Sequence, residues 1–264
     1  MKTPVSFSGA LALLLAATLA ARAADTGHSG HTSAAVRSLP AGWEPAVHDD
    51  AVNTFTSFPK AEFRTGDSPD AAVIEAEGWV GGDYQRLWWK ADGEQETQGA
   101  KAGEIELQAL YSRLFSPFWD FQTGIRVDRR FSGRTRDTTG YFVVGVEGLA
   151  PYWFEIEPTL FVSEKGKVSA RFTASYDLLI TRRWVIQPRL DLNAAFQKNT
   201  PRNLATGFND IEVGLRLRYD LTRQFAPYVG VEWHRALGAT AGLARRTGEN
   251  VSTTSFVFGL RTWF

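Results

Sequence analysis

The sequence predicts an all-β protein, an antiparallel transmembrane β-barrel, and three observations support this fold class. The last strand alternates strictly from Phe256 to Phe264, so its two faces differ. Similar alternating segments recur from residue 81 onward, separated by turn residues. The N-terminus reads as an export signal. Because lipid contains no water, only helices and closed barrels satisfy every backbone polar group there.

Residues 1–23 have the three parts of a secretory signal peptide. Lys2 supplies a positive charge, residues 11–20 are apolar, and Ala21-Arg22-Ala23 is a small-x-small cleavage site. The apolar run is too short to cross a bilayer, although an uncleaved anchor is the alternative. We therefore expect export, cleavage after Ala23 and location in the outer membrane.

Composition excludes several other classes of protein. The 29 basic and 29 acidic residues cancel, so no basic excess favours nucleic acid as a partner. The chain has no cysteine, so an exported fold cannot rely on disulfides, and a closed barrel removes that need. Mean hydropathy is −0.22, which suits a barrel because alternating apolar and polar residues average out.

Residues 24–80 differ from the rest and are expected to be a mostly disordered periplasmic segment. They contain three of the four histidines, four prolines and only short apolar islands. Residues 73–80 are the one stretch that could form a further strand.

Residues 81–264 are expected to form the barrel, with ten strands, although eight or twelve are open alternatives. The expected strands are 83–92, 103–114, 119–130, 138–148, 152–163, 167–179, 183–194, 209–220, 225–236 and 252–264. Short connectors such as Ser116-Pro117 alternate with long ones such as 195–208 and 238–251, as short periplasmic turns alternate with outer loops. An even strand number then leaves both ends of the barrel in the periplasm, where we expect Phe264 to serve assembly.

Aromatic residues gather at the expected strand ends. The chain has nine tryptophans and eighteen phenylalanines. Those at strand ends include Trp119, Trp153, Trp184, Phe225, Trp263 and Phe264. Aromatic girdles mark both membrane interfaces of such barrels, whereas ordinary packing is the alternative explanation.

Charged residues occupy the faces expected to point inward. The bases are Arg86, Lys90, Arg126, Arg171, Arg189, Arg216, Arg218 and Arg261. The acids are Glu104, Glu106, Asp128, Glu147, Glu155, Glu157, Asp177, Asp191, Glu212, Asp220 and Glu232. A barrel of about ten strands is narrow, so we expect a lumen filled with paired charges. The slight excess of acids favours cations.

Six stretches of the barrel resemble the copper resistance protein B family of outer-membrane proteins. They are 77–93 (EGWVGGDYQRLWWKADG), 106–120 (ELQALYSRLFSPFWD), 145–154 (GVEGLAPYWF), 176–189 (YDLLITRRWVIQPR), 210–219 (DIEVGLRLRY) and 225–233 (FAPYVGVEW). The resemblance implies a role in copper handling, with copper bound or transported and usually a periplasmic multicopper oxidase alongside. We expect a monomer in contact with outer-membrane lipid, and not an enzyme.

The N-terminal segment departs from this family, whose members carry many methionines and histidines there. The only methionine is Met1, which leaves with the signal. His28 and His31 remain, three residues apart, and are a candidate site for Cu(II) rather than Cu(I). His48 is a weaker candidate.

His234 and Glu232 are the candidate metal residues within the barrel. They are two residues apart on one strand and therefore share a face, which the pattern places toward the lumen. Such a pair suits a divalent metal or a pH-sensitive gate, whereas a role in a polar network is the alternative. Two other functions stay open: a structural or adhesive barrel, and a lipid hydrolase in which Ser255 pairs with His234.

Overall fold

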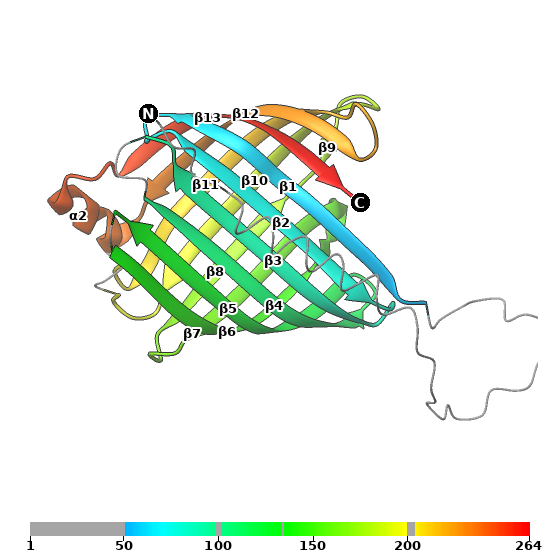
Figure 1. Cartoon of the computed structure of the whole chain (residues 1–264), viewed down its shortest axis with the longest axis horizontal. Coiled ribbons are helices and arrows are strands. Elements are labelled where there is room, and N and C mark those ends of the chain that lie inside the picture. The colour runs from blue at the N-terminus through cyan, green and yellow to red at the C-terminus, as the bar shows by residue number, and fades with distance from the viewer. Residues whose placement is uncertain (1–50, 99–101, 134, 200–203) are drawn as a thin grey trace, which may run out of the picture.

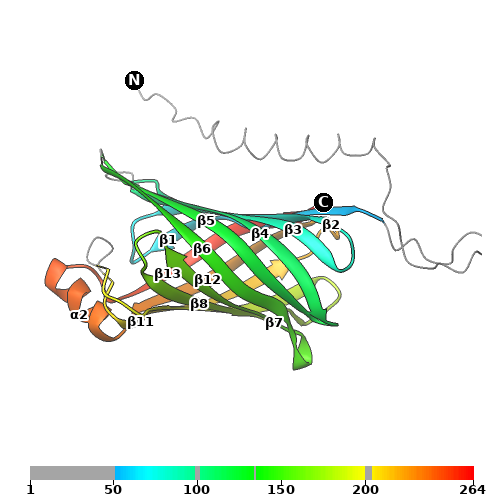
Figure 2. The same cartoon turned by 90° about the horizontal axis from the view of Figure 1, so that it is seen from below.

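The computed structural model describes residues 51–98, 102–133, 135–199 and 204–264, which form a closed antiparallel barrel of twelve strands (Figures 1 and 2). The wall strands are β1 (Asn53–Gly66), β2 (Ala71–Gly81), β3 (Gln85–Glu96), β4 (Gly103–Ser116), β5 (Trp119–Ser132), β6 (Thr135–Ala150), β7 (Phe154–Ser163), β8 (Val168–Ser175), β10 (Trp184–Ala195), β11 (Gly207–Tyr219), β12 (Phe225–Ala236) and β13 (Ser252–Trp263). The short β9 (Leu178–Leu179) pairs only with β10 and lies outside this ring. Pairing of β1 with β13 closes the barrel.

The expectation that the barrel begins near residue 81 is wrong, because β1 and β2 precede it. The segment 24–80 was expected to be mostly disordered, yet 53–66 and 71–81 are wall strands. The twelve strands agree with the larger of the alternatives given above. Residues 24–50 of that segment, with His28, His31 and His48, and the expected signal 1–23 lie outside the described residues.

A β-bulge at Pro59 explains why β1 could not be recognised from alternating inward and outward residues. The register of β1 shifts between Phe58 and Ala61 against β13, and the register against β2 shifts at the same place. A bulge inserts one extra residue, so the inward phase changes. Ser57 is buried on one side of the bulge, and Lys60 and Glu62 are buried on the other. The same alternation of inward and outward side chains therefore does not continue along the whole strand.

The two ends of the barrel differ, as the connector lengths predict. The C-terminus and the start of β1 lie toward one end, and the long connections lie at the other (Figure 1). The longest of these folds as α2 (Gly238–Thr247), which contacts β11 and β12. Thr240 of α2 accepts a hydrogen bond from Asn209 at 2.9 Å and thereby ties the helix to the wall. None of the helices in the described ranges is long and apolar enough to cross a membrane.

Apolar side chains cover the outer surface of the wall. On β13, Phe256 and Phe258 are more than half exposed, whereas Val257 between them and Ser255 before them are buried inside. Exposed aromatic residues form a girdle at the end that carries the short turns. They include Tyr84, Phe115, Phe118, Tyr152, Trp153, Phe154, Trp184, Phe225 and Phe264. This end is accordingly the periplasmic membrane interface.

The inner wall holds a small apolar cluster. Trp88, Leu110, Val143 and Phe161 are buried together. Arginine side chains cover part of this surface, and the Arg126 guanidinium lies 4.4 Å from the centre of the Phe161 ring. The apolar cluster therefore supports charged residues of the lumen instead of facing open water.

Candidate functional site in the barrel lumen

Arginine–carboxylate pairs cross the lumen and join strands that are not neighbours in the wall. Arg171 of β8 contacts both carboxylate oxygens of Glu106 on β4, at 3.1 and 3.0 Å. Arg189 of β10 reaches Glu75 of β2 at 3.1 Å. Because these strands lie across the barrel from one another, the pairs fill the interior. The expectation of a lumen filled with paired charges is therefore confirmed.

The most deeply buried of these pairs centres on Arg216. Its guanidinium contacts Glu62 at 3.0 and 3.1 Å and Glu232 at 2.7 Å. Arg64 contacts the other oxygen of Glu232 at 2.6 Å. Tyr228 donates its hydroxyl hydrogen to Glu62 at 2.9 Å. The side chains of Glu62, Glu232 and Arg216 are at most 4% exposed, so the two acids depend on these partners.

Two lysines occupy the middle of the lumen. The Lys90 ammonium lies 2.7 Å from Glu157 and 3.0 Å from Glu147, on strands opposite its own. The Lys60 ammonium lies 3.3 Å from Glu75. A lysine ammonium is a single point charge on a flexible stem and has no rigid fork. These contacts can therefore rearrange more readily than the bidentate arginine pairs.

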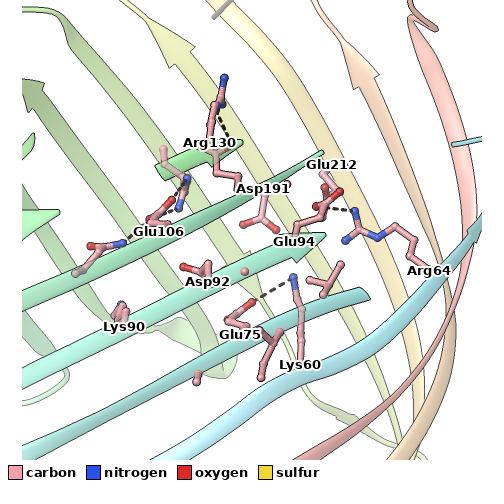
Figure 3. A pocket seen from close by; sticks show the side chains of 18 of the residues that line it. Lys60, Arg64, Glu75, Lys90, Asp92, Glu94, Glu106, Arg130, Asp191 and Glu212 are labelled. Atoms are coloured by element: carbon pink, nitrogen blue, oxygen red, sulfur yellow. Dashed lines mark hydrogen bonds and ion pairs between the residues drawn. The ribbon is translucent and has the colours of Figure 1, made fainter. Parts of the chain in front are cut away.

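An acidic cavity of about 680 Å³ lies among these pairs. Figure 3 shows its charged side chains pointing toward a common space from several strands. Eleven acids and six bases line it, so acids predominate as the sequence indicated. The acids are Glu75, Glu77, Asp92, Glu94, Glu96, Glu104, Glu106, Asp137, Glu157, Asp191 and Glu212, and the bases are Lys60, Arg64, Lys90, Arg130, Arg171 and Arg189.

The side chains of five of these acids make no direct ion pair or hydrogen bond with any residue that the structure describes. They are Glu77, Asp92 and Glu212, which come from β2, β3 and β11, and Glu96 and Asp137, which come from β3 and β6. In Figure 3, Asp92 projects into the cavity between Glu75 and Glu106. Glu77 lies opposite Lys90 across the strands, but the Lys90 ammonium turns to Glu147 and Glu157 instead. This part of the lumen therefore holds carboxyl groups that no described base pairs with directly.

His234 and Glu232 both line a second cavity of about 490 Å³, which shares several residues with the first. Their expected inward orientation is thus confirmed. His234 lies opposite Glu212 in the strand register. Glu232 is held by Arg64 and Arg216, so a metal bound there must compete with two guanidinium groups. Within the described ranges, no group of three or more histidine, aspartate or glutamate residues is arranged to hold a metal ion.

Ser255 and His234 do not form the pair that a hydrolase needs. Ser255 lies opposite Glu232, whereas His234 lies opposite Thr253. Both line the same cavity, but no hydrogen bond joins the serine hydroxyl to the imidazole in the described structure. Ser255 is 4% exposed and faces the lumen, away from the lipid on which such an enzyme acts. The geometry does not support a lipid hydrolase function.

Several charged residues that line the lumen went unrecognised in the sequence, Asp92 among them. Lys60, Glu62 and Arg64 lie on β1, and Glu75 and Glu77 lie on β2. The E-x-E spacing of Glu75 and Glu77, beside small residues, was the one available signal, because two acids on one strand face imply a polar side.

The fold and its charged lumen define an outer-membrane β-barrel protein. The model of the family described as "Copper resistance protein B precursor (CopB)" matches residues 52–264. The chain belongs to this family.

Curated relatives agree with this assignment. Copper resistance protein B of Escherichia coli is 38% identical over 220 residues, which are 83% of this chain and 72% of the relative. The copper resistance protein B homolog of Pseudomonas syringae pv. tomato (strain ATCC BAA-871 / DC3000) is 39% identical over 239 residues, 90% of this chain and 74% of the relative. Among solved structures, outer membrane phospholipase A from Escherichia coli aligns with a TM-score of 0.48 and 11% identity, over 80% of this chain and 92% of that one.

Proposed function

We propose that this protein acts in copper resistance by taking copper ions into the acidic lumen of an outer-membrane barrel. Family membership supports the copper role. The observation that carries the lumen role is the excess of acids around the larger cavity, five of them without a direct side-chain partner among the described residues. A cleft with an excess of one sign of charge attracts ions of the other sign.

The ligand chemistry of the lumen favours Cu(II) over Cu(I). Carboxylate oxygens and one imidazole line the cavities, and neither cysteine nor any methionine besides Met1 occurs in the chain. Soft thiolate and thioether ligands select Cu(I), whereas oxygen and imidazole suit the divalent ion. The arginine pairs that cross the lumen narrow it. An entering copper ion must therefore displace a side-chain cation such as Lys90 from its carboxylates. Copper is cargo in this proposal, not a resident cofactor.

The decisive experiment compares copper in cells with and without the protein. A deletion strain, its complemented parent and a strain complemented with a barrel altered only in the lumen are grown in copper. Cellular and periplasmic copper are then measured by mass spectrometry. We expect the deletion to change both pools and the lumen variant to reproduce part of that change. Identical copper content and tolerance in all three strains would favour a purely structural barrel.

His234 provides a test of pH dependence in the lumen. Protonated imidazole adds positive charge beside Glu212, so we expect entry of divalent ions to fall as the pH decreases. The His234→Ala variant should lose this dependence while the barrel stays folded, because the side chain faces the lumen. Divalent-ion flux into vesicles, measured at several pH values, checks the expectation. An unchanged pH profile in the variant would remove His234 from the path.

The N-terminal segment is proposed to add a weak Cu(II) site. After cleavage at Ala23, His28 and His31 would lie close to the new N-terminus. We expect the mature protein to bind Cu(II) weakly and the His28→Ala, His31→Ala double variant to lose that binding, as measured by calorimetry. Equal binding would exclude the segment. We further propose that the barrel works as a monomer beside a periplasmic multicopper oxidase.

A further inference from the structure

Two arginines lie next to each other on the outer surface of the barrel wall. Arg129 of β5 and Arg136 of β6 are both exposed. On β5 the neighbouring Asp128 is buried inside, so Arg129 points outward. Arg129 lies opposite Thr138, and Arg136 lies opposite Phe131. The two arginines are therefore diagonal neighbours on one face, and such neighbours have Cα atoms about 7–8 Å apart.

The two arginines lie at the height where the wall meets the membrane interface on the side opposite the periplasm. Trp119 begins β5 at the periplasmic aromatic girdle, and Arg129 follows ten residues later. A tilted strand crosses the hydrocarbon layer in about 9–11 residues. Arg129 thus lies where the strand leaves the lipid on the far side, and Arg136 lies further out. Below them the wall is apolar, with Ile125, Val127 and Phe142 exposed.

Neither arginine has a partner in the described part of the chain. Arg130 and Arg126, which point inward from the same strand, pair with Glu104 and Asp128. No ion pair or side-chain hydrogen bond is formed by Arg129 or Arg136 among described residues. Glu164, an acid on the neighbouring β7–β8 turn, lies against Gly140 instead. Two adjacent like charges repel each other, so this arrangement calls for an external anion.

We propose that Arg129 and Arg136 bind the phosphate groups of the glycolipid that forms the outer leaflet. A guanidinium donates two parallel hydrogen bonds to a phosphate and is the preferred partner for such groups. The lipid acyl chains then cover the apolar surface of Ile125, Val127 and Phe142. This places two phosphate ligands over a hydrophobic wall, which matches the order of headgroup and chains in a membrane. The site is independent of the lumen and of copper.

The test measures the lipid retained by the full-length protein. Wild type and the Arg129→Gln, Arg136→Gln double variant are extracted from outer membranes in mild detergent, and bound lipid A is counted by native mass spectrometry. We expect retention to fall about tenfold in the double variant, because two charge-assisted contacts are lost. The Arg129→Lys, Arg136→Lys variant should retain an intermediate amount. The matched control is Arg113→Gln, an exposed outward arginine near the periplasmic end of β4.

A second measurement separates specific binding from general attraction. The thermal midpoint of the folded barrel is compared in phosphatidylethanolamine vesicles that contain bisphosphorylated lipid A, dephosphorylated lipid A or phosphatidylglycerol. We expect the bisphosphorylated lipid to raise the midpoint most, and only when both arginines are present. Equal retention by wild type and double variant, or equal stabilisation by phosphatidylglycerol, overturns the proposal.

Discussion

Replacing Arg216 with glutamine should destabilise the folded barrel by about 3–5 kcal/mol, the cost of breaking a buried ion pair on one side. Glu62 and Glu232 are almost fully buried and would then share only Arg64 as a close guanidinium. Two buried carboxylates with one remaining counter-charge leave an uncompensated negative charge in the lumen. The barrel in vesicles is unfolded in increasing urea concentrations. The folded fraction is read from its heat-dependent mobility in gels.

Neutralising Arg216 together with Glu62 and Glu232 should restore most of the stability lost in the single variant. In the triple variant Arg216→Gln, Glu62→Gln, Glu232→Gln, no buried acid is left without its guanidinium, although Arg64 then loses two partners. The matched control is Arg223→Gln, in the exposed turn between β11 and β12, which should leave the unfolding midpoint unchanged. If the single Arg216 variant unfolds at the wild-type urea concentration, the network around Arg216 does not hold the barrel together.

Most of the strands from β3 to β13 could be predicted because their inward and outward residues alternate along most of each strand. On β11, Arg216 and Arg218 are buried while the alternating Leu215 and Leu217 are exposed, as the sequence pattern indicates. Strand β1 could not be found this way, since the bulge at Pro59 moves Lys60 and Glu62 onto the opposite phase. Its pairing with β13 is also a contact between the two ends of the barrel, which local pattern cannot reveal.

The inward direction of the charges could be predicted, but their partners could not. Which acid meets Arg189 depends on the strand number and the stagger that bring β10 across from β2. A ten-stranded barrel without β1 and β2 contains neither Glu62 nor Glu75, so its arginines would have met other acids. Of the two arginines that pair with Glu232 and argue against its use as a metal ligand, Arg64 lies on the missing strand β1.

Neutralising three of the acids without direct partners should reduce cation entry strongly and leave the barrel intact. Glu77, Asp92 and Glu212 line the larger cavity, and no described residue forms an ion pair with them. The Glu77→Gln, Asp92→Asn, Glu212→Gln variant therefore removes negative charge without breaking a pair. Charged clefts raise the rate of ion capture by about 10–1,000-fold, so we expect Cu(II) entry into vesicles to fall at least tenfold at low salt.

Two comparisons make this expectation specific. The Glu164→Gln variant removes one exposed acid outside the cavity lining and should leave Cu(II) entry unchanged. Raising the salt concentration should slow entry through the wild-type barrel much more than through the triple variant, because mobile ions screen the acids. The unfolding midpoint of the triple variant should equal or exceed that of wild type, since carboxylates without partners repel one another. Should Cu(II) enter equally fast through both barrels at low salt, the acidic cavity is not the path of the ion, and copper resistance must depend on another part of the chain.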